Sequence, residues 1–333
     1  MSNIRIAING FGRIGRLAAR NMLDRPDLEL VAINDLADNA ALTYLFKHDS
    51  VQGRFNKPTH LEGETLYVDG RAIKMTEHKD PMDCKWGEQG VDIVLECTGV
   101  FLTRDKVQPH FSSGAKCVLL SAPAKEKGIK TVCMGVNEET IEPGENLISN
   151  ASCTTNAVAA PLKALHEAFG ITYGVLNTIH AYTISQSLLD APQKKDIRAS
   201  RAAALNLVPS STGAAKAVGL VLPALAGKLD GMSVRTTNPT GSIADLTLLF
   251  EREPSIEAAH AALAAYAEKH PTILWFSSDD LVSTDIVGLP FSSVIDSKMT
   301  MKVGPMLKIL SWYDNEMGYA TRLVDLAAYV GKM

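Results

Sequence analysis

The chain has 333 residues, 46% of them hydrophobic, which is enough for about two domains that each bury a core. Its 33 Lys and Arg against 37 Asp and Glu give a formal charge of -4, which excludes the broad positive field that nucleic acids or anionic membranes attract. No apolar run approaches the roughly 18 residues of a membrane-spanning helix. The start, MSNIRIAING, has the pattern of a strand and not of a signal peptide. We therefore expect a cytoplasmic protein without nucleic-acid or membrane partners.

Short β-branched runs alternate with helical periods in the first third of the chain. Strands are predicted over IRIAI (4–8), LELVAI (28–33), VDIVLEC (91–97) and KCVLLSA (116–122), with a helix over 13–23. This alternation is typical of a parallel α/β sheet.

The pattern changes after Asn156. An apolar helix is expected to reach about Phe169, and longer alternating strands follow over 174–183, 242–252 and 305–314, as in a mixed or antiparallel sheet covered on one face. Further helices are predicted over 255–270, with Ser255 as its cap, and over 319–330. Between the predicted strands 174–183 and 242–252, the stretch 191–209 carries four basic residues without a period, so it is either a functional loop or a solvated surface loop.

A GxGxxG motif, formed by Gly10, Gly12 and Gly15, lies between the first strand and the first helix. Asp35 closes the next strand twenty residues after Gly15, where an acid can accept hydrogen bonds from the adenosine ribose. The helix N-terminus and Arg13 add donors for a pyrophosphate. Because Asp35 would repel a 2′-phosphate, the pattern favours NAD over NADP, although a glycine turn in another βαβ unit stays open.

The five cysteines lack CxxC spacing, so neither a disulfide framework nor a metal site is indicated (Cys84, Cys97, Cys117, Cys133, Cys153). Cys153, in SNASCTTN, precedes a helical run, and a helix N-terminus stabilises a thiolate. His180 ends an apolar strand and is the best candidate for its base. A buried thiol and a core histidine remain the alternatives at this point.

Ten segments in unbroken order resemble the phosphorylating (type I) glyceraldehyde-3-phosphate dehydrogenases. They are INGFGRIGR, VAINDLAD, HDSVQGRF, ECTGVF, SAPAKEKGIKTVCMGVN, SNASCTTN, HAYT, RAAALNLVPSSTGAAKAVG, KLDGMSVR and WYDNEMGY. The resemblance implies a Rossmann-type NAD-binding domain over 1–152, completed by a C-terminal helix over about 316–333. It also implies an α+β catalytic and oligomerisation domain with a mostly antiparallel sheet over 153–315, in a homotetramer where the 191–209 loop reaches a neighbour.

The resemblance further implies a glycolytic reaction, the oxidation of glyceraldehyde 3-phosphate by NAD and phosphate to 1,3-bisphosphoglycerate. Cys153 would form a thiohemiacetal and then an acyl thioester, with His180 as acid and base. Cofactor contacts are carried over to Gly10, Phe11, Gly12, Arg13, Ile14, Asp35, Thr98, Ser121 and, at the nicotinamide carboxamide, Asn315. The substrate phosphate is assigned to Thr183 and Arg235, and the attacking phosphate to Ser152, Thr154, Thr212, Gly213 and the basic-loop residue Arg198. For Ser152 and Thr212, capping or turn bonding is the alternative.

Four departures from the family pattern lie near these residues: Ile184 after HAYT, Ala199 in the basic loop, the run TTNPTGSIADL after Arg235, and Met317. Ala199 removes one possible anion ligand, and the Ala191-Pro192 pair leaves some use of NADP open. Three other functions remain as alternatives: arsenate as the acceptor, a different substrate such as erythrose 4-phosphate, and a non-catalytic NAD- or RNA-binding regulator.

Overall fold

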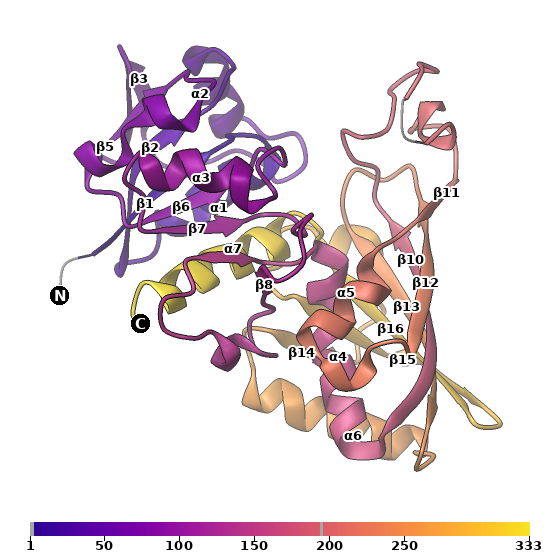
Figure 1. Ribbon diagram of the computed structural model, residues 1–333. Helices are drawn as coiled ribbons and strands as arrows, with labels where there is room; N and C mark the ends of the chain where they lie inside the picture. Colours follow the sequence, from indigo (N-terminus) through magenta and orange to yellow (C-terminus); the bar gives the residue numbers. More distant parts are fainter. Residues whose placement is uncertain (1–2, 194–195) are drawn as a thin grey trace. The chain divides into compact units, whose positions relative to one another are not determined.

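The computed structural model describes residues 3–193 and 196–333 (Figure 1). Lys194 and Lys195, two of the four basic residues predicted in the 191–209 loop, lie outside the described residues. The chain forms two compact units, one made of the chain up to Val132 with Glu138–Ala151 and Ala320–Met333, the other of Cys133–Asn137 with Ser152–Tyr319. The chain therefore passes between the units more than once, and Cys133–Asn137 belongs to the second.

A nine-stranded sheet, counted over the described residues, forms the centre of the first unit, in the order β3-β4-β5-β2-β1-β6-β7-β9-β8. The strands are β1 (Ile4–Asn9), β2 (Leu28–Asn34), β3 (Thr59–Glu62), β4 (Thr65–Val68), β5 (Arg71–Thr76), β6 (Ile93–Glu96), β7 (Cys117–Leu120), β8 (Lys130–Thr131) and β9 (Leu147–Ser149). Pairing is parallel except among β3, β4 and β5. The predicted parallel α/β sheet is confirmed, whereas the short strands β3 to β5 were not foreseen.

The helices of the first unit are α1 (Arg13–Met22), α2 (Asn39–Lys47) and α3 (Arg104–Ser112), joined by most of α7 (Met317–Val330). The last helix is tied to α1 and the turn after it, because Asn21 Nδ2 donates to Thr321 Oγ1 at 2.9 Å and Arg25 pairs with Asp325 at 2.8 Å. Leu323 and Leu326 of α7 are fully buried. The C-terminal helix is thus part of the first unit's core.

The second unit is built on a seven-stranded sheet, again counted over the described residues, in the order β11-β12-β10-β13-β16-β15-β14. Its strands are β10 (Ile171–His180), β11 (Val208–Ser211), β12 (Leu229–Arg235), β13 (Ser242–Phe250), β14 (Leu274–Ser277), β15 (Ser293–Val303) and β16 (Met306–Tyr313). Only β10–β12 and β14–β15 pair in parallel, so the expected mostly antiparallel sheet is confirmed.

Three helices of the second unit pack on this sheet: α4 (Cys153–Phe169), α5 (Ala214–Val221) and α6 (Ile256–Lys269) (Figure 1). The predicted cap of α6 is confirmed, since Ser255 Oγ accepts the N–H of Ala258 at 3.1 Å. β10 ends at His180, three residues before the predicted end of that strand. None of the helices in the described part of the chain is long and apolar enough to cross a membrane.

Candidate functional site

The glycine motif of the first unit forms a tight turn between β1 and α1. Gly10 has φ +97°, and a Cβ there would lie 2.6 Å from the backbone N of Thr98. A Cβ on Gly15 would lie 2.1 Å from the Gly10 carbonyl oxygen. Only glycine fits either position, because a side chain would have to overlap the backbone.

Gly12 has a different reason to be glycine. It precedes α1, and a Cβ added to it meets no atom within 4 Å. The open space therefore lies at a helix N-terminus, where the first N–H groups have no partner in the helix and attract anions. Arg13 and Ile14 begin this helix. The turn fits the pyrophosphate of a dinucleotide, which must approach the backbone closely.

Asp35 lies against this turn, just beyond the end of β2. Its Oδ2 accepts the N–H of Phe11 at 2.6 Å and its Oδ1 accepts that of Ala37 at 3.0 Å. The Phe11 side chain is fully buried, so only its backbone can contact a ligand. The half-exposed carboxylate of Asp35 is thus fixed beside the glycine turn, as ribose recognition requires.

Arg13 is held by an ion pair. Its Nη1 lies 2.6 Å from Asp49 Oδ2, and the Asp49 side chain is almost completely buried. Burial acts to raise the pKa of Asp49, but the Arg13 guanidinium and the N–H groups of Gln52 and Val51 keep it below its ordinary value. Asp49 therefore stays charged and fixes the position of Arg13 on α1.

Thr98 and Ser121 follow the carboxyl ends of the neighbouring strands β6 and β7. Glu96, completely buried, accepts hydrogen bonds from the N–H and hydroxyl of Thr98, and its carbonyl accepts the N–H of Ser121 at 2.9 Å. His110 Nε2 lies 3.1 Å from the other oxygen of Glu96. β1 has β2 on one side and β6 on the other, so the strand order reverses here, and such switch points are where open α/β sheets bind ligands.

In the second unit, Cys153 is the first residue of α4. Ser152 is its N-cap, with Oγ accepting the N–H of Thr155 at 3.1 Å. Cys153 Sγ lies 3.4 Å from His180 Nε2. His180 ends β10 and is only 4% exposed. The geometry thus brings together the two residues that the sequence could not pair by spacing.

Arg235 reaches the same imidazole from the adjacent strand. β10 and β12 run in parallel with His180 opposite Arg235, and Arg235 Nη1 lies 2.6 Å from His180 Nδ1. Nδ1 is also 2.8 Å from the Ala181 carbonyl oxygen. Because a guanidinium only donates, the contact with Arg235 requires a lone pair on Nδ1 and the proton on Nε2, whereas the contact with Ala181 requires the opposite tautomer.

Burial sets the protonation of the pair. It raises the pKa of Cys153, against the opposing effects of the Arg235 charge and of hydrogen bonds from Thr154. Burial, together with the nearby Arg235 charge, lowers the pKa of His180 to about 4. Thiol and imidazole are therefore both neutral near pH 7 in the free chain, so the helix N-terminus alone does not produce a thiolate.

Tyr313 was not predicted from the sequence, although it stands two residues before Asn315 at the end of β16. Its hydroxyl lies 2.9 Å from Thr154 Oγ1 and 2.8 Å from Thr178 Oγ1, and its ring packs edge-on against His180. Burial raises its pKa, so the phenol stays protonated. The signal available was an aromatic residue with a hydroxyl at a strand end in WYDNEMGY. Tyr313 links the start of α4 to β10.

The remaining anion ligands inferred from the resemblance have local partners. Thr183 Oγ1 lies 2.8 Å from Ser185 Oγ, and Thr212 Oγ1 accepts the N–H of Ala214 at 3.2 Å. Gly213 caps α5 and an added Cβ would meet nothing within 4 Å, while Arg198 is exposed on a short 3-10 helix. Ser152 therefore acts as the N-cap of α4, and Thr212 makes a turn hydrogen bond before α5, as the alternative held. Their anion-binding roles stay predictions.

Asn315 is buried in the second unit, where its Oδ1 accepts the hydroxyls of Ser242 at 2.9 Å and Thr240 at 3.3 Å. Its carbonyl end is therefore occupied by protein. This leaves the Nδ2 end as the one that can act toward a ligand.

Comparisons with known proteins match the parts of the chain that carry both sites. Residues 4–104 match the model of the glyceraldehyde 3-phosphate dehydrogenase NAD binding domain, and residues 152–315 match that of the C-terminal domain of the same proteins. The chain is 49% identical over 330 residues to a glyceraldehyde-3-phosphate dehydrogenase of Geobacillus stearothermophilus, covering 98% of each chain. It is 48% identical to that of Streptomyces coelicolor, with 98% of each chain covered, and 49% identical to that of Mycobacterium avium, with 99% covered.

A nucleotide-binding unit of this kind and a paired Cys153 and His180 define an NAD-dependent oxidoreductase. Both family models and the near-complete coverage of the relatives narrow this class further. The chain belongs to the glyceraldehyde-3-phosphate dehydrogenase family.

Proposed function

We propose that the chain oxidises glyceraldehyde 3-phosphate with NAD and transfers the acyl group to inorganic phosphate, forming 1,3-bisphosphoglycerate. The observation that carries this proposal is the 3.4 Å contact between Cys153 Sγ and His180 Nε2 at the start of α4. A thiol beside an imidazole at a helix N-terminus is suited to covalent attack on an aldehyde. The names of the relatives supply the substrate.

His180 Nε2 takes the thiol proton as Cys153 Sγ bonds to the aldehyde carbon, and the proton is returned to the oxygen to give a thiohemiacetal. NAD, when bound, supplies the hydride acceptor. His180 then removes the hydroxyl proton as the carbonyl re-forms in the thioester. A phosphate oxygen attacks that carbonyl, Cys153 leaves as a thiolate, and the thiolate recovers its proton from His180. The backbone N–H groups at the start of α4 are suited to stabilise the oxyanions.

Arg235 couples substrate binding to this proton transfer. In the free chain its guanidinium donates to His180 Nδ1 and disfavours the imidazolium. When a substrate phosphate draws Arg235 away, Nδ1 can donate to the Ala181 carbonyl 2.8 Å from it, and Nε2 becomes the acceptor that the thiol needs. Substrate binding thus makes Nε2 available to accept the thiol proton.

Two anion positions follow from the residues assigned by resemblance. Arg235, with its planar fork, and Thr183 hold the substrate phosphate. The attacking phosphate is bound mainly by hydroxyl and N–H donors, which add no positive charge that would retain the product. These donors belong to Ser152, Thr154, Thr212 and Gly213. Arg198 of the basic loop binds the same phosphate. The space beside Gly213 at the start of α5 supports this position.

The first unit holds NAD through the glycine turn and Asp35, and the second performs catalysis and oligomerisation. The open space at Gly12 and the fixed carboxylate of Asp35 support these cofactor contacts. Residues assigned to cofactor binding are Gly10, Phe11, Gly12, Arg13, Ile14, Asp35, Thr98, Ser121 and Asn315.

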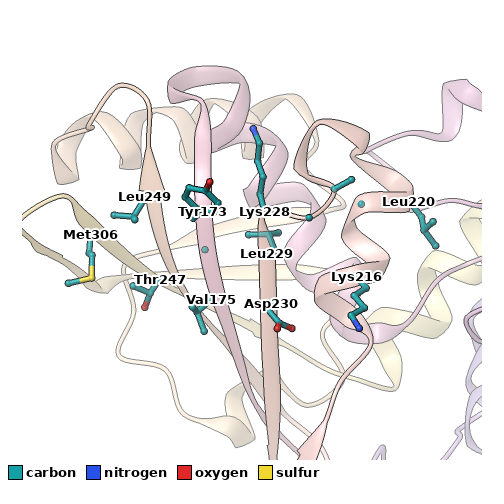
Figure 2. A pocket seen from close by; sticks show the side chains of 14 residues that line it. Tyr173, Val175, Lys216, Leu220, Lys228, Leu229, Asp230, Thr247, Leu249 and Met306 are labelled. Carbon is teal, nitrogen blue, oxygen red and sulfur yellow. The ribbon is translucent and has the colours of Figure 1, made fainter.

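We also propose that the second unit associates with copies of itself into a homotetramer. A hollow of about 700 Å³ lies on its sheet. Its lining side chains include the apolar Tyr173, Val175 and Met306 (Figure 2). Tyr173 is 65% exposed and Val175 60%, on a sheet face that would carry polar groups if it met water. The same hollow carries Asp230 of β12 and Lys228 just before that strand, a charge pattern that can complement itself across a two-fold axis.

The 191–209 loop supports association at a second surface. It and the residues before it expose six large apolar side chains: Ile184, Leu188, Leu189, Ile197, Leu205 and Leu207. Light scattering after size exclusion should give the mass of four chains. Val175→Glu should reduce that mass, because a charge buried in an apolar interface is costly. A wild-type chain that elutes as a monomer would rule out the assembly.

We also propose that the protein is located in the cytoplasm, where its five free thiols stay reduced.

The test of the reaction is the initial rate of NADH formation with glyceraldehyde 3-phosphate and phosphate, arsenate or no acceptor. We expect turnover to require phosphate or arsenate and Cys153→Ser to lose at least about 10³-fold in rate. Cys117→Ala, a buried thiol of the first unit, is the matched control and should keep its activity. Undiminished turnover without an oxyanion, or a higher kcat/KM for erythrose 4-phosphate, would contradict the proposal.

A further inference from the structure

The loop between β12 and β13 contains one of the four departures from the family pattern, and it contacts Asn315. Thr240 and Ser242 both donate to the Asn315 carbonyl oxygen. All three side chains are buried. The loop therefore takes part in placing the one amide that the proposed function assigns to the nicotinamide carboxamide.

Ser242 is used from both sides. Its Oγ accepts the N–H of Ala181 at 3.1 Å, and its own proton is donated to Asn315 Oδ1 at 2.9 Å. Ala181 directly follows His180, whose Nδ1 lies 2.8 Å from the Ala181 carbonyl oxygen. One hydroxyl thus connects the peptide that carries the catalytic base to the amide of Asn315.

Thr240 provides the second anchor. Its hydroxyl lies 3.0 Å from Asp314 Oδ1 and 3.3 Å from Asn315 Oδ1. The same Asp314 oxygen accepts the N–H groups of Glu316 and Met317 at the start of α7, at 2.8 and 3.0 Å. Asn315 is therefore held between a capped helix start and the loop.

The loop is held by hydrogen bonds of its own. Asn238 Nδ2 donates to the carbonyl oxygens of Thr240 and Gly241, at 2.8 and 2.6 Å. Gly241 has φ +84°, and a Cβ there would lie 2.4 Å from the Ser283 carbonyl oxygen. The two hydroxyls are consequently presented from a backbone that is hydrogen-bonded within itself and closely packed against the Ser283 carbonyl.

We propose that Ser242 and Thr240 are positioning residues that fix the orientation of the Asn315 amide, so that its Nδ2 is offered to the carbonyl oxygen of the nicotinamide carboxamide. Turning the amide would leave the buried Ser242 hydroxyl without its acceptor. It would also break the weaker contact of Thr240, whose proton is shared with Asp314. The proposal rests on the role proposed for Asn315. It adds that Ser242 sets the place of this amide relative to His180.

Equilibrium binding of NAD and of ADP-ribose, which lacks the nicotinamide, separates positioning from general loss of structure. Calorimetry on the full chain should show that Ser242→Ala and Thr240→Val each reduce the NAD-to-ADP-ribose affinity ratio roughly tenfold, the effect of losing one buried hydrogen bond. ADP-ribose affinity should stay unchanged. Thr240→Ser keeps the hydroxyl and should keep the ratio.

Ser293→Ala is the matched control, because Ser293 is a buried serine of the same sheet whose hydroxyl contacts Ser311 at 2.7 Å. It should leave the ratio unchanged. Asn315→Ala tests the role of Asn315 itself. If this variant does not lower the NAD-to-ADP-ribose affinity ratio, Asn315 does not bind the nicotinamide carboxamide. If Asn315→Ala lowers the ratio but Ser242→Ala and Thr240→Val do not, only the positioning proposal is overturned. Equal losses for both ligands in these two variants also overturn it.

Discussion

The two candidate sites occupy the same kind of place, the carboxyl ends of parallel strands, but are built in opposite ways. In the first unit, β1 and β6 end in a backbone turn with open space at Gly12 and donors at a helix start. In the second, β10 ends in the buried His180, which contacts Cys153, and β12 ends in the half-buried Arg235, which contacts His180. The first site is an open space lined by backbone donors. The second is a cluster of side chains in which burial keeps the thiol and the imidazole neutral while no ligand is bound.

This difference shows how binding and chemistry make different demands on a fold. Recognition of a diphosphate needs N–H groups and the absence of side chains, which glycine supplies at little cost. Proton transfer needs titratable groups whose pKa values respond to their surroundings, and burial provides that response. Substitutions should therefore act on affinity in the first site and on rate or pKa in the second.

The largest effect is expected from His180→Gln. Loss of the base should reduce kcat by about 10² to 10⁴-fold, the usual contribution of general acid and base catalysis. NADH formation measured by stopped flow tests this. His260→Gln, a half-buried histidine of α6 whose ring packs on Phe276, is the control and should retain the wild-type rate. An active His180→Gln would mean that the Cys–His contact is only packing.

Arg235→Leu should raise the KM for glyceraldehyde 3-phosphate by about 10²-fold, because a charged hydrogen-bonding partner of the phosphate is lost. The KM for unphosphorylated glyceraldehyde should not change. The pH profile of Cys153 alkylation should move to higher pH, since the Arg235 charge lowers the pKa of that thiol. Arg235→Lys keeps the charge and should leave the alkylation profile closer to that of the wild type. An unmoved profile in Arg235→Leu would show that the charge does not act on the thiol.

Gly10→Ala and Gly12→Ala should separate fold from ligand within the first site. The first places a Cβ 2.6 Å from Thr98 N and should reduce the free energy of unfolding by about 1–3 kcal/mol. The second meets no protein atom, so thermal unfolding should be unchanged while NAD affinity falls at least roughly tenfold. Normal NAD affinity in Gly12→Ala would mean that the open space is not the pyrophosphate site.

Asp35→Asn should have the smallest effect, weakening NAD by about tenfold through loss of charged hydrogen bonds to the ribose. NADP should bind better, because the repulsion of its 2′-phosphate is removed. Fluorescence titration of both cofactors gives the ratio. Asp38→Asn is the control, since Asp38 only caps α2 by accepting the N–H of Ala41 at 2.8 Å. An unchanged ratio in Asp35→Asn would exclude this acid from ribose recognition.

The sequence predicts the two sites unequally. The dinucleotide turn is contiguous, so spacing alone places its glycines and Asp35 beside one another. The pairing of His180 with Arg235 depends on the parallel register of β10 and β12, which no local pattern encodes. Only the resemblance to a family brought these residues together in advance. Tyr313 escaped notice because its partners, Thr154 and Thr178, lie far from it in the sequence.

The helices and strands were also predicted best where a local sequence pattern encodes them. Long periodic segments such as α4 and α6 were predicted close to their ends, since many residues share one pattern. The short strands β3 to β5 were missed because four to six residues carry too little periodicity. Tertiary contacts, and not a local pattern, place Cys133–Asn137 in the second unit. Tyr266 Oη donates to the Gly135 carbonyl oxygen, and Lys163 Nζ donates to that of Val136.

The last fourteen residues of the chain belong to the first unit, and this affects how the protein is made. Until the ribosome reaches Ala320, the nascent first unit lacks Leu323 and Leu326 from its core and the Asp325 partner of Arg25. Gly331 also packs directly against Ile4, so the first strand is fully packed only after Gly331 has been synthesised. The second unit, complete at Tyr319, can fold first, although domains usually fold in the order of their synthesis. The part that begins the chain is thus the last to be finished, and truncation of even a few C-terminal residues should affect it before the other.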